Sequence, residues 1–287
     1  MNILIFTDND LDGAGSALFI KWLYGSNVSS LKVIDSTEFT LISEFNSINL
    51  NDYDKIFILD LDLNRDQISQ VDNEKVVVFD HHKQHEENKY IYKRAKAVVE
   101  QTTSCISLLR SKFDSKISLS DEQEQLIEYI DDYDSYKLHH KDSLKLNAIH
   151  KTFNKPKAEK FIEAFKDGFR PYNVQEKNGI KLFIKKFREQ LEGQVFSGKI
   201  KNYDTVSIIS NYAPSEVANY IISKHNADIG IVVNLDTNTV SFRRGKECDV
   251  DVSIIAKTLC EGGGSAAIAG GKLTEQFANL TKNFLPC

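Results

Sequence analysis

Apolar runs alternate with helical patterns along the first half of the chain. Short apolar runs at 3–6, 33–35, 55–59 and 75–79 predict buried strands, because strands covered on both faces are apolar throughout. Between the first two, residues 13–23 carry apolar side chains at helical spacing. This alternation of strand and helix predicts a parallel α/β sheet.

The middle of the chain is predicted to be helical. Thr102-Thr103-Ser104 precedes an apolar helix over 106–109, as an N-cap does. Ser120-Asp121-Glu122-Gln123 resembles a capping box, and it opens a further helix through Ile130. From about 154 to 196 the chain is strongly charged with apolar residues at helical spacing, which favours a connector between two lobes.

The last ninety or so residues predict a second, smaller α/β unit. Residues 205–209 form a strand pattern, and 229–234 with 240–243 form a hairpin pattern around Asp236-Thr237-Asn238. Helices are expected from Pro214 and over 252–259. We therefore predict three segments: a parallel-sheet domain over 1–150, a helical connector over 151–197 and a smaller α/β domain over 198–287.

Composition indicates an ordinary soluble protein. Of 287 residues, 41% are hydrophobic and 27% charged, and the net charge of −5 argues against a dedicated nucleic-acid coat. No uncharged stretch approaches the ~20 residues that a membrane span needs, and no secretory signal is recognised. The four cysteines lack the C-x-x-C spacing, which favours reduced thiols and a cytoplasmic location without membrane contact.

Acidic residues cluster where the predicted strands end. Asp8, Asp10 and Asp12 alternate directly after the first strand, and Asp60 ends the third. Ligands gather beyond the carboxyl ends of parallel strands, and carboxylates brought close together raise one another's pKa unless a cation is present. The alternatives are a solvated Asx-rich turn for the first group and a helix cap for Asp60.

Histidines follow the fourth predicted strand in the string Asp80-His81-His82. Imidazole suits Mn, Fe, Zn or Co, and a neighbouring carboxylate commonly orients it. We expect His85 to be a surface residue and His139-His140 to be solvated.

A further acidic group, Asp131, Asp132 and Asp134, crowds the end of the predicted helix that begins after Ser120. The negative end of the helix dipole disfavours anions there, so a nearby cation or good solvation is required. Spacing alone does not select a ligand among the three.

Together these strings resemble the DHH phosphoesterase superfamily with a C-terminal DHHA1-type domain, a group that includes RecJ-like exonucleases, oligoribonucleases and cyclic-dinucleotide phosphodiesterases. The resemblance covers nearly the whole chain, and its motifs occur in order. They are Asp10-Leu11-Asp12-Gly13-Ala14-Gly15-Ser16-Ala17, Leu59-Asp60, Phe79-Asp80-His81-His82, Tyr129-Ile130-Asp131-Asp132-Tyr133-Asp134, Val240-Ser241-Phe242-Arg243 and Gly262-Gly263-Gly264-Ser265-Ala266-Ala267.

The resemblance implies two divalent cations, usually Mn²⁺, with Mg²⁺ or Co²⁺ as alternatives. By the match of motifs, Asp10 and Asp12 would bind different ions and Asp60 would bridge them. His81 and Asp132 would complete the second site, with Asp131 left open as the alternative to Asp132.

The same resemblance implies roles for the remaining motif residues. Asp80 would support the histidine pair, and His82 would lie toward the scissile phosphate. Many oligoribonuclease-type members have a histidine where this chain has Phe6, and Asp8 would compensate as a metal ligand.

In the second unit the resemblance implies contacts with substrate. The backbone of Gly262, Gly263 and Gly264 can approach phosphate oxygens closely, while Ser265 stands where the family usually has histidine. Arg243 and Arg244 are candidates for a terminal phosphate, because a guanidinium binds it bidentately; the alternative is a solvated strand residue.

The function expected from these features is hydrolysis of short oligonucleotides or dinucleotides by a water activated by two metal ions. The modest length and negative charge favour small substrates over long ones. The alternatives are an exonuclease on longer single strands and a catalytically weakened nucleotide-binding protein. The sequence leaves a homodimer open.

Overall fold

Two units make up the computed structural model, Met1–Ile180 and Lys181–Cys287. It describes residues 1–34, 40–154, 156–245, 248–260, 262–264 and 266–273. Each unit is described by itself below. Ser265, one of the expected substrate contacts, lies outside the described residues.

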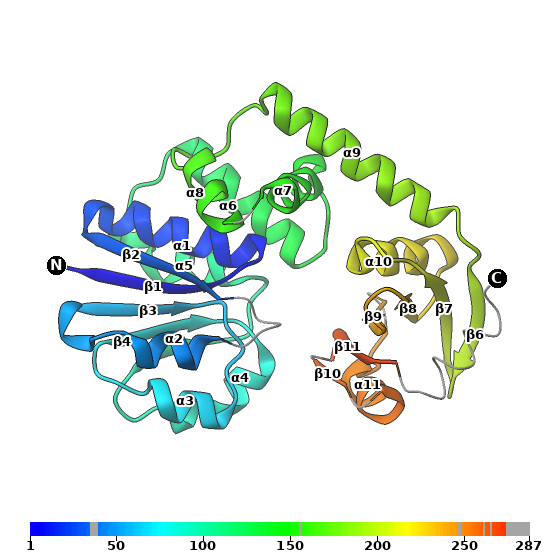
Figure 1. Cartoon of the computed structure of the whole chain (residues 1–287), viewed down its shortest axis with the longest axis horizontal. Helices are drawn as coiled ribbons and strands as arrows, with labels where there is room; N and C mark the ends of the chain where they lie inside the picture. Colours follow the sequence, from blue (N-terminus) through cyan, green and yellow to red (C-terminus); the bar gives the residue numbers. More distant parts are fainter. Residues whose placement is uncertain (35–39, 155, 246–247, 261, 265, 274–287) are drawn as a thin grey trace. The chain divides into compact units, whose positions relative to one another are not determined.

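The first unit begins with alternating strands and helices and continues with helices alone (Figure 1). Its strands are β1 (Ile3–Asp8), β2 (Val28–Ile34), β3 (Lys55–Leu59), β4 (Val76–Asp80) and β5 (Lys96–Val99). Its helices are α1 (Leu11–Tyr24), α2 (Leu41–Ser47), α3 (Arg65–Val71), α4 (Lys83–Asn88), α5 (Cys105–Phe113), α6 (Asp121–Asp134), α7 (Lys141–Thr152) and α8 (Lys157–Ala164). Single-turn helices are η1 (Gly25–Asn27), η2 (Leu50–Asp52), η3 (Lys89–Ile91) and η4 (Asp114–Lys116).

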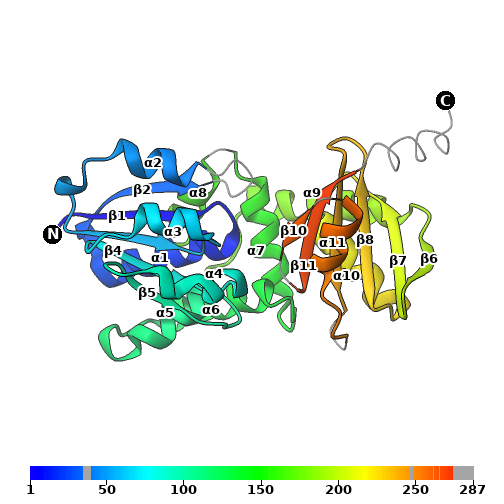
Figure 2. The same ribbon diagram turned by 90° about the horizontal axis from the view of Figure 1, so that it is seen from below.

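All five strands of the first unit are parallel, in the order β2-β1-β3-β4-β5. Helices cover both faces: α1 and α5 lie on one side, and α2 and α3 on the other (Figures 1 and 2). The second strand begins earlier than its apolar run, and β5 was not predicted because its one buried residue, Val99, gives little apolar signal.

Apolar side chains of alternate strand positions form the core beneath α2 and α3. Leu4, Ile56, Ile58 and Val78 are buried there among other aliphatic residues. Phe6 is completely buried in the same cluster, with its ring centroid 6.1 Å from that of Phe45. Phe6, where the resemblance leads us to expect histidine, is therefore a core residue.

Helix ends in the first unit follow the signals in the sequence. The hydroxyl of Ser104 caps α5 by accepting the N–H of Ser107. At α6 the predicted capping box is present, with Ser120 and Gln123 bonding each other's backbone N–H. These caps fix the start of both helices, and the start of α5 contributes to the site described below.

In the second unit a mixed sheet has the order β10-β11-β9-β8-β7-β6. Its strands are β6 (Phe196–Ile200), β7 (Tyr203–Ile209), β8 (Ile229–Asn234), β9 (Thr239–Arg244), β10 (Gly263–Gly264) and β11 (Ile268–Lys272). Its helices are α10 (Pro214–His225) and α11 (Val252–Cys260), and α9 (Val174–Leu191) carries the boundary between the units. The predicted hairpin is β8 with β9, which pair antiparallel.

The fold class predicted from the sequence is confirmed: a parallel-sheet domain, a helical segment and a smaller α/β domain follow one another. Within the described residues, no helix is both long and apolar enough for a membrane span. Cys105, Cys248 and Cys260 are free thiols.

Candidate metal centre

The candidate site lies where the strand order of the first sheet reverses. Strand β1 lies between β2 and β3, so the chain first adds β2 on one side of β1 and then crosses over to add β3 on the other side. Side chains at the carboxyl ends of strands converge at such a reversal. Asp8 ends β1, Asp60 directly follows β3, and Asp80 ends β4. The order 2-1-3-4-5 therefore explains why acids distant in sequence meet.

The turn from β1 to α1 positions two carboxylates. Asp10 caps α1 by accepting the N–H of Gly13 at 2.8 Å. Asp12, in the first turn, is buried, and its two oxygens accept the N–H groups of Cys105 at 2.6 Å and Ile106 at 2.9 Å. Because these amides open α5, the carboxylate lies at the positive end of that helix.

Gly13 allows this turn to form. A Cβ at this position would lie 2.5 Å from the carbonyl oxygen of Asp8, which belongs to the backbone and cannot move aside. The hydroxyl of Thr7 also donates to the carbonyl of Gly13 at 2.6 Å. Helix α1 therefore starts directly against the end of β1, as the motif requires.

Asp60 is held in a costly state. Its backbone has φ of +57°, in the left-handed region that disfavours residues with a Cβ, and it is only 2% exposed. Its Oδ1 is buried and makes no hydrogen bond. A buried carboxylate oxygen without a partner is unfavourable unless a proton or a cation binds it.

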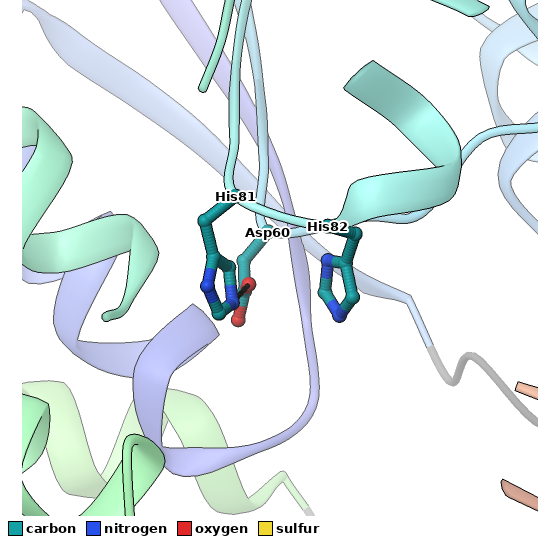
Figure 3. A group of neighbouring side chains, drawn as sticks. All are labelled: Asp60, His81 and His82. Atoms are coloured by element: carbon teal, nitrogen blue, oxygen red, sulfur yellow. Dashed lines mark ion pairs between the residues drawn. The ribbon is translucent and has the colours of Figure 1, made fainter. Parts of the chain in front are cut away.

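His81 lies close to three acids, and Figure 3 shows it beside one of them, Asp60. Its Nε2 is 3.4 Å from Oδ1 of Asp60, 3.5 Å from Oδ2 of Asp134 and 3.8 Å from Oδ2 of Asp12. Its Nδ1 lies 3.3 Å from the carbonyl oxygen of Thr102. A hydrogen on Nδ1 would satisfy that carbonyl and leave Nε2 for a metal ion.

The crowding of these acids changes their protonation. Burial, with Asp10 close by, raises the pKa of Asp12 to about 6. Burial and the neighbouring carboxylate of Asp12 raise the pKa of Asp60 and of Asp134 well above the ordinary value. Although burial opposes it, Asp60, Asp12 and Asp134 raise the pKa of His81 to about 11. A site that holds protons this tightly would exchange them for a divalent cation.

Two overlapping groups of ligand atoms follow from this arrangement. Asp60, His81 and His82 form one, and Asp12, His81 and Asp134 form the other, with the atoms in each group within 4.8 Å of one another. In Figure 3 the rings of His81 and His82 point to the same side as Asp60. Oxygen and imidazole donors around an unpartnered buried oxygen suit a divalent metal ion.

The structure separates the three acids at the end of α6. Asp131 accepts hydrogen bonds from the hydroxyls of Thr103 and Ser104, so it anchors the start of α5. Asp134, which was not among the expected ligands, is the one that lies beside His81 and Asp12.

Asp132, the expected ligand, has other partners. It accepts the N–H groups of His139 at 2.9 Å and His140 at 3.0 Å, and the hydroxyl of Ser143 at 2.6 Å. Among the residues that the structure describes, neither ligand group includes Asp132. These bonds form only in the fold, so no spacing in the sequence could reveal them.

The ligand groups also leave out Asp8 and Asp10, within the described part of the chain. Asp8 is half-buried at the end of β1, where its Oδ1 accepts the N–H of Asn9 at 2.7 Å. Asp10 is exposed, yet it is near enough to raise the pKa of Asp12, Asp60 and Asp134. Both therefore border the groups.

Asp80 is buried and fully bonded. Its oxygens lie 2.8 Å from Nδ1 of His82 and 2.8 Å from Nδ1 of His85. Burial opposes ionisation, but the two imidazoles hold the pKa of Asp80 well below its ordinary range. The expectation that His85 is a surface residue is wrong: its side chain is completely buried. The spacing from His82 to His85, three residues on a helix, was the signal available in the sequence.

The histidine pair at 139 and 140 lies at the surface. His139 is 73% exposed, and His140 pairs with Glu128 at 3.0 Å. Within the described residues, neither joins a ligand group, which agrees with the expectation of solvated side chains.

In the second unit the expected substrate residues have structural partners. Arg243 on β9 donates to the hydroxyl of Ser215 at the start of α10, and Arg244 follows it on the same strand. A Cβ on Gly262 would lie 2.0 Å from the carbonyl oxygen of Gly270, while one on Gly263 would meet no atom within 4 Å. Strand pairing alone therefore accounts for Gly262.

Comparison with known proteins agrees with this geometry. The family described as "DHH family, N-terminal domain" matches this chain over residues 2–131. No curated protein matches the sequence. The pGpG-specific phosphodiesterase PggH from Vibrio cholerae has a similar structure, with 14% identity and a TM-score of 0.64 over 99% of this chain and 97% of that one.

Two RecJ structures with manganese are also similar. Exonuclease RecJ bound to manganese has 10% identity and a TM-score of 0.57, over 98% of this chain and 88% of that one. RecJ from Thermus thermophilus with Mn²⁺ has 10% identity and a TM-score of 0.57, over 98% of this chain and 51% of that one. At these identities the likeness concerns the fold.

Proposed function

We propose that the chain is a metal-dependent phosphodiesterase of the DHH type acting on short oligonucleotides or dinucleotides, because the N-terminal domain of the DHH family matches residues 2–131. The observation that carries the proposal is the buried Oδ1 of Asp60, which makes no hydrogen bond and lies 3.4 Å from Nε2 of His81, with Asp12 and Asp134 close to the same ring. The similarity in fold to a phosphodiesterase of pGpG supports a dinucleotide as the substrate.

The residues proposed to hold the metal ions come from the carboxyl edge of the sheet and the end of α6. Asp60, His81 and Asp12 are the central ligands, and Asp134 takes the place expected for Asp132. Asp8 and Asp10 would complete the coordination from the end of β1. We propose two ions, with Mn²⁺ favoured over Mg²⁺ or Co²⁺. When bound, they supply an activated water and neutralise phosphate charge.

His82 is proposed to act on the phosphodiester itself. Its Nδ1 is held by Asp80, which leaves Nε2 available for a substrate oxygen. Although burial opposes it, Asp80 raises the pKa of His82 to about 10, so the ring carries a proton near neutral pH. From Nε2 that proton can be donated to the leaving oxygen as the bond to phosphorus breaks.

The proposed substrate contacts of the second unit are the guanidinium groups of Arg243 and Arg244 and the backbone of Gly262, Gly263 and Gly264. Arg243 also carries a structural hydrogen bond to Ser215. A guanidinium that is already oriented by a hydroxyl loses less freedom on binding a terminal phosphate.

The test is a substrate panel with the purified protein and Mn²⁺. It contains linear dinucleotides such as pGpG, cyclic dinucleotides, RNA and DNA of increasing length, and 3′-phosphoadenosine phosphate. We expect turnover of dinucleotides and a fall in rate beyond a few nucleotides. A rate that rises with length would favour an exonuclease on longer single strands, and tight binding without turnover would favour a nucleotide-binding protein.

Two variants complete this test. We expect Asp80→Ala and His81→Ala to lose Mn²⁺-dependent hydrolysis, because the first removes the partner of His82 and the second removes a central ligand. Full activity in both variants would overturn the assignment of the site.

A further inference from the structure

A chain of hydrogen bonds with a buried centre joins His82, a member of one ligand group, to Asp80, His85 and Tyr92. Each oxygen of Asp80 faces one imidazole, with 2.8 Å from Oδ1 to Nδ1 of His82 and 2.8 Å from Oδ2 to Nδ1 of His85. The other ring nitrogen of His85, Nε2, lies 2.9 Å from the hydroxyl of Tyr92. The side chains of Asp80 and His85 are completely buried.

The chemistry of these groups determines the direction of the bonds. An ionised carboxylate only accepts hydrogen bonds, so both Nδ1 atoms donate to Asp80. The Nε2 of His85 then faces a phenol hydroxyl, which can donate to it. The hydroxyl of Tyr92 therefore donates to His85, and His85 and His82 each donate from Nδ1 to Asp80. Such a fully satisfied buried network is rigid.

The elements that carry the series are short and lie close together. Asp80 is the last residue of β4, and His82 is the N-cap residue of α4, whose first turn contains His85. The carbonyl of His82 accepts the N–H of Glu86 at 3.0 Å, which closes that turn. Residues three apart on a helix share a face, so both rings can reach the same carboxylate.

We propose that His85 and Tyr92 are positioning residues for His82. His85, held by Tyr92, bonds Oδ2 of Asp80, which also accepts the backbone N–H of His82 at 3.3 Å. Both bonds fix the carboxylate, and the fixed carboxylate orients the ring of His82 with Nε2 toward the phosphodiester. The proposal rests on the proposed function, in which His82 acts on the leaving oxygen. Outer partners of this kind typically change activity or metal affinity by ~10–100-fold when they are removed.

Three variants separate the steps of the series. His85→Leu removes both contacts of the ring. His85→Asn keeps a donor near the position of Nδ1 but cannot reach Tyr92. Tyr92→Phe removes only the hydroxyl. The matched controls are Tyr90→Phe, at a tyrosine that is 59% exposed two residues away, and His225→Leu, at an exposed histidine of α10.

The first measurement is steady-state hydrolysis of a dinucleotide in Mn²⁺, with kcat and KM determined separately. We expect His85→Leu to lower kcat ~10–100-fold with KM unchanged. His85→Asn should recover part of that loss, and Tyr92→Phe should lower kcat by less than either. The controls should match the wild type.

The second measurement does not depend on turnover. In the metal-free protein, ¹⁵N-edited proton NMR detects the hydrogen on Nδ1 of His82, which the carboxylate of Asp80 protects from exchange with water. We expect this signal to shift and exchange faster in His85→Leu and to be retained in both controls. Circular dichroism and urea unfolding establish that each variant is folded.

The outcomes are distinct. If kcat in Tyr92→Phe and His85→Asn equals that of the wild type and the NMR signal of His82 is unchanged in His85→Leu, the inference is overturned and His85 is a structural residue only. If the wild type hydrolyses no substrate of the panel, the proposed function fails, while the NMR comparison still tests whether His85 orients His82.

Discussion

The carboxyl edge of the first sheet differs from the glycine hairpin of the second unit, formed by β10 and β11 beside β9, in how well its motif residues are satisfied. At the sheet edge Asp60 keeps a buried oxygen without a hydrogen bond and a left-handed backbone. In the hairpin, Gly262 and Gly264 are accounted for by close strand pairing, and Arg243 has a hydroxyl partner. Residues held in an energetically unfavourable state that the fold itself does not compensate mark a site for a ligand. Motif residues whose contacts within the fold already explain them have to be tested by their effect on substrate binding.

The largest effect is expected at Asp60. Asp60→Asn should lower Mn²⁺-dependent hydrolysis more than ~100-fold, because a direct ligand matters at least as much as an outer partner. The free energy of unfolding in chelator should change little, because the substitution removes repulsion from Asp12 and Asp10 as well as the ion pair with His81 at 3.4 Å. Rates and urea unfolding check both parts.

The matched control for that variant is Asp66→Asn, at an exposed aspartate in α3. It should change neither quantity. Full activity of Asp60→Asn, or a large loss of its stability, would assign Asp60 to the fold and remove the contrast with the hairpin.

The next effect concerns the end of α6. Asp134→Asn should weaken Mn²⁺ binding ~10–100-fold with stability preserved, because its carboxylate faces His81. Asp132→Asn should instead lower the free energy of unfolding by about 2–4 kcal/mol, because it accepts three hydrogen bonds. Isothermal titration with Mn²⁺ and urea unfolding separate the two, and the reverse pattern would restore Asp132 as the ligand.

The hairpin offers a matched pair of glycines. At Gly264 φ is +138° and a Cβ would lie 2.3 Å from the carbonyl oxygen of Ile268, so Gly264→Ala should destabilise the protein by about 2–4 kcal/mol. Gly263→Ala has open space and should cost less than ~0.5 kcal/mol. A rise in KM for Gly263→Ala would identify a substrate contact, and an unchanged KM would leave the hairpin structural. Thermal unfolding and steady-state kinetics provide these values.

The smallest effect is the pH dependence of the metal-free protein. Burial raises the pKa of Asp12 to about 6 from 3.8, so the folded state binds this proton more tightly than the unfolded state. Its contribution to stability is therefore complete below about pH 4 and is lost as pH rises through about 6, a change of ~1–3 kcal/mol.

Asp12→Asn removes that dependence. Urea unfolding in chelator from about pH 4 to 7 should show the wild type losing stability relative to the variant across this window. A constant difference between the two proteins would mean that Asp12 does not hold its proton more tightly in the folded state.

The sequence predicts the fold class because the buried strands β1, β3 and β4 carry apolar runs, and because helices α5 and α6 start at capping residues. Strands β5 and β6 escaped prediction because they lie at sheet edges and bury few side chains: Lys96 and Phe196 are exposed. Their place is determined by backbone pairing with β4 and β7, which leaves little trace in the side-chain pattern.

Part of the candidate site could be read from strand ends, since Asp60 and His81 follow apolar runs. The sequence could not show which of Asp132 and Asp134 faces the metal centre. The difference arises because the backbone N–H groups of the loop before α7 bond the carboxylate of Asp132. His85 was missed because its spacing from His82 was the one signal for it, and the polar segment around it gives no sign of burial. Hydrogen bonds between residues of different secondary-structure segments decide the role of Asp132 and the burial of His85, and the sequence does not show them.

The central residues of the candidate metal centre lie between Asp12 and Asp134, in the first of the two units. Domains generally fold as units, with the N-terminal one first during synthesis. We therefore expect the nascent first unit to capture its cation while the rest of the chain is still being translated. The proposed cation would then be bound before the residues proposed to contact substrate are made.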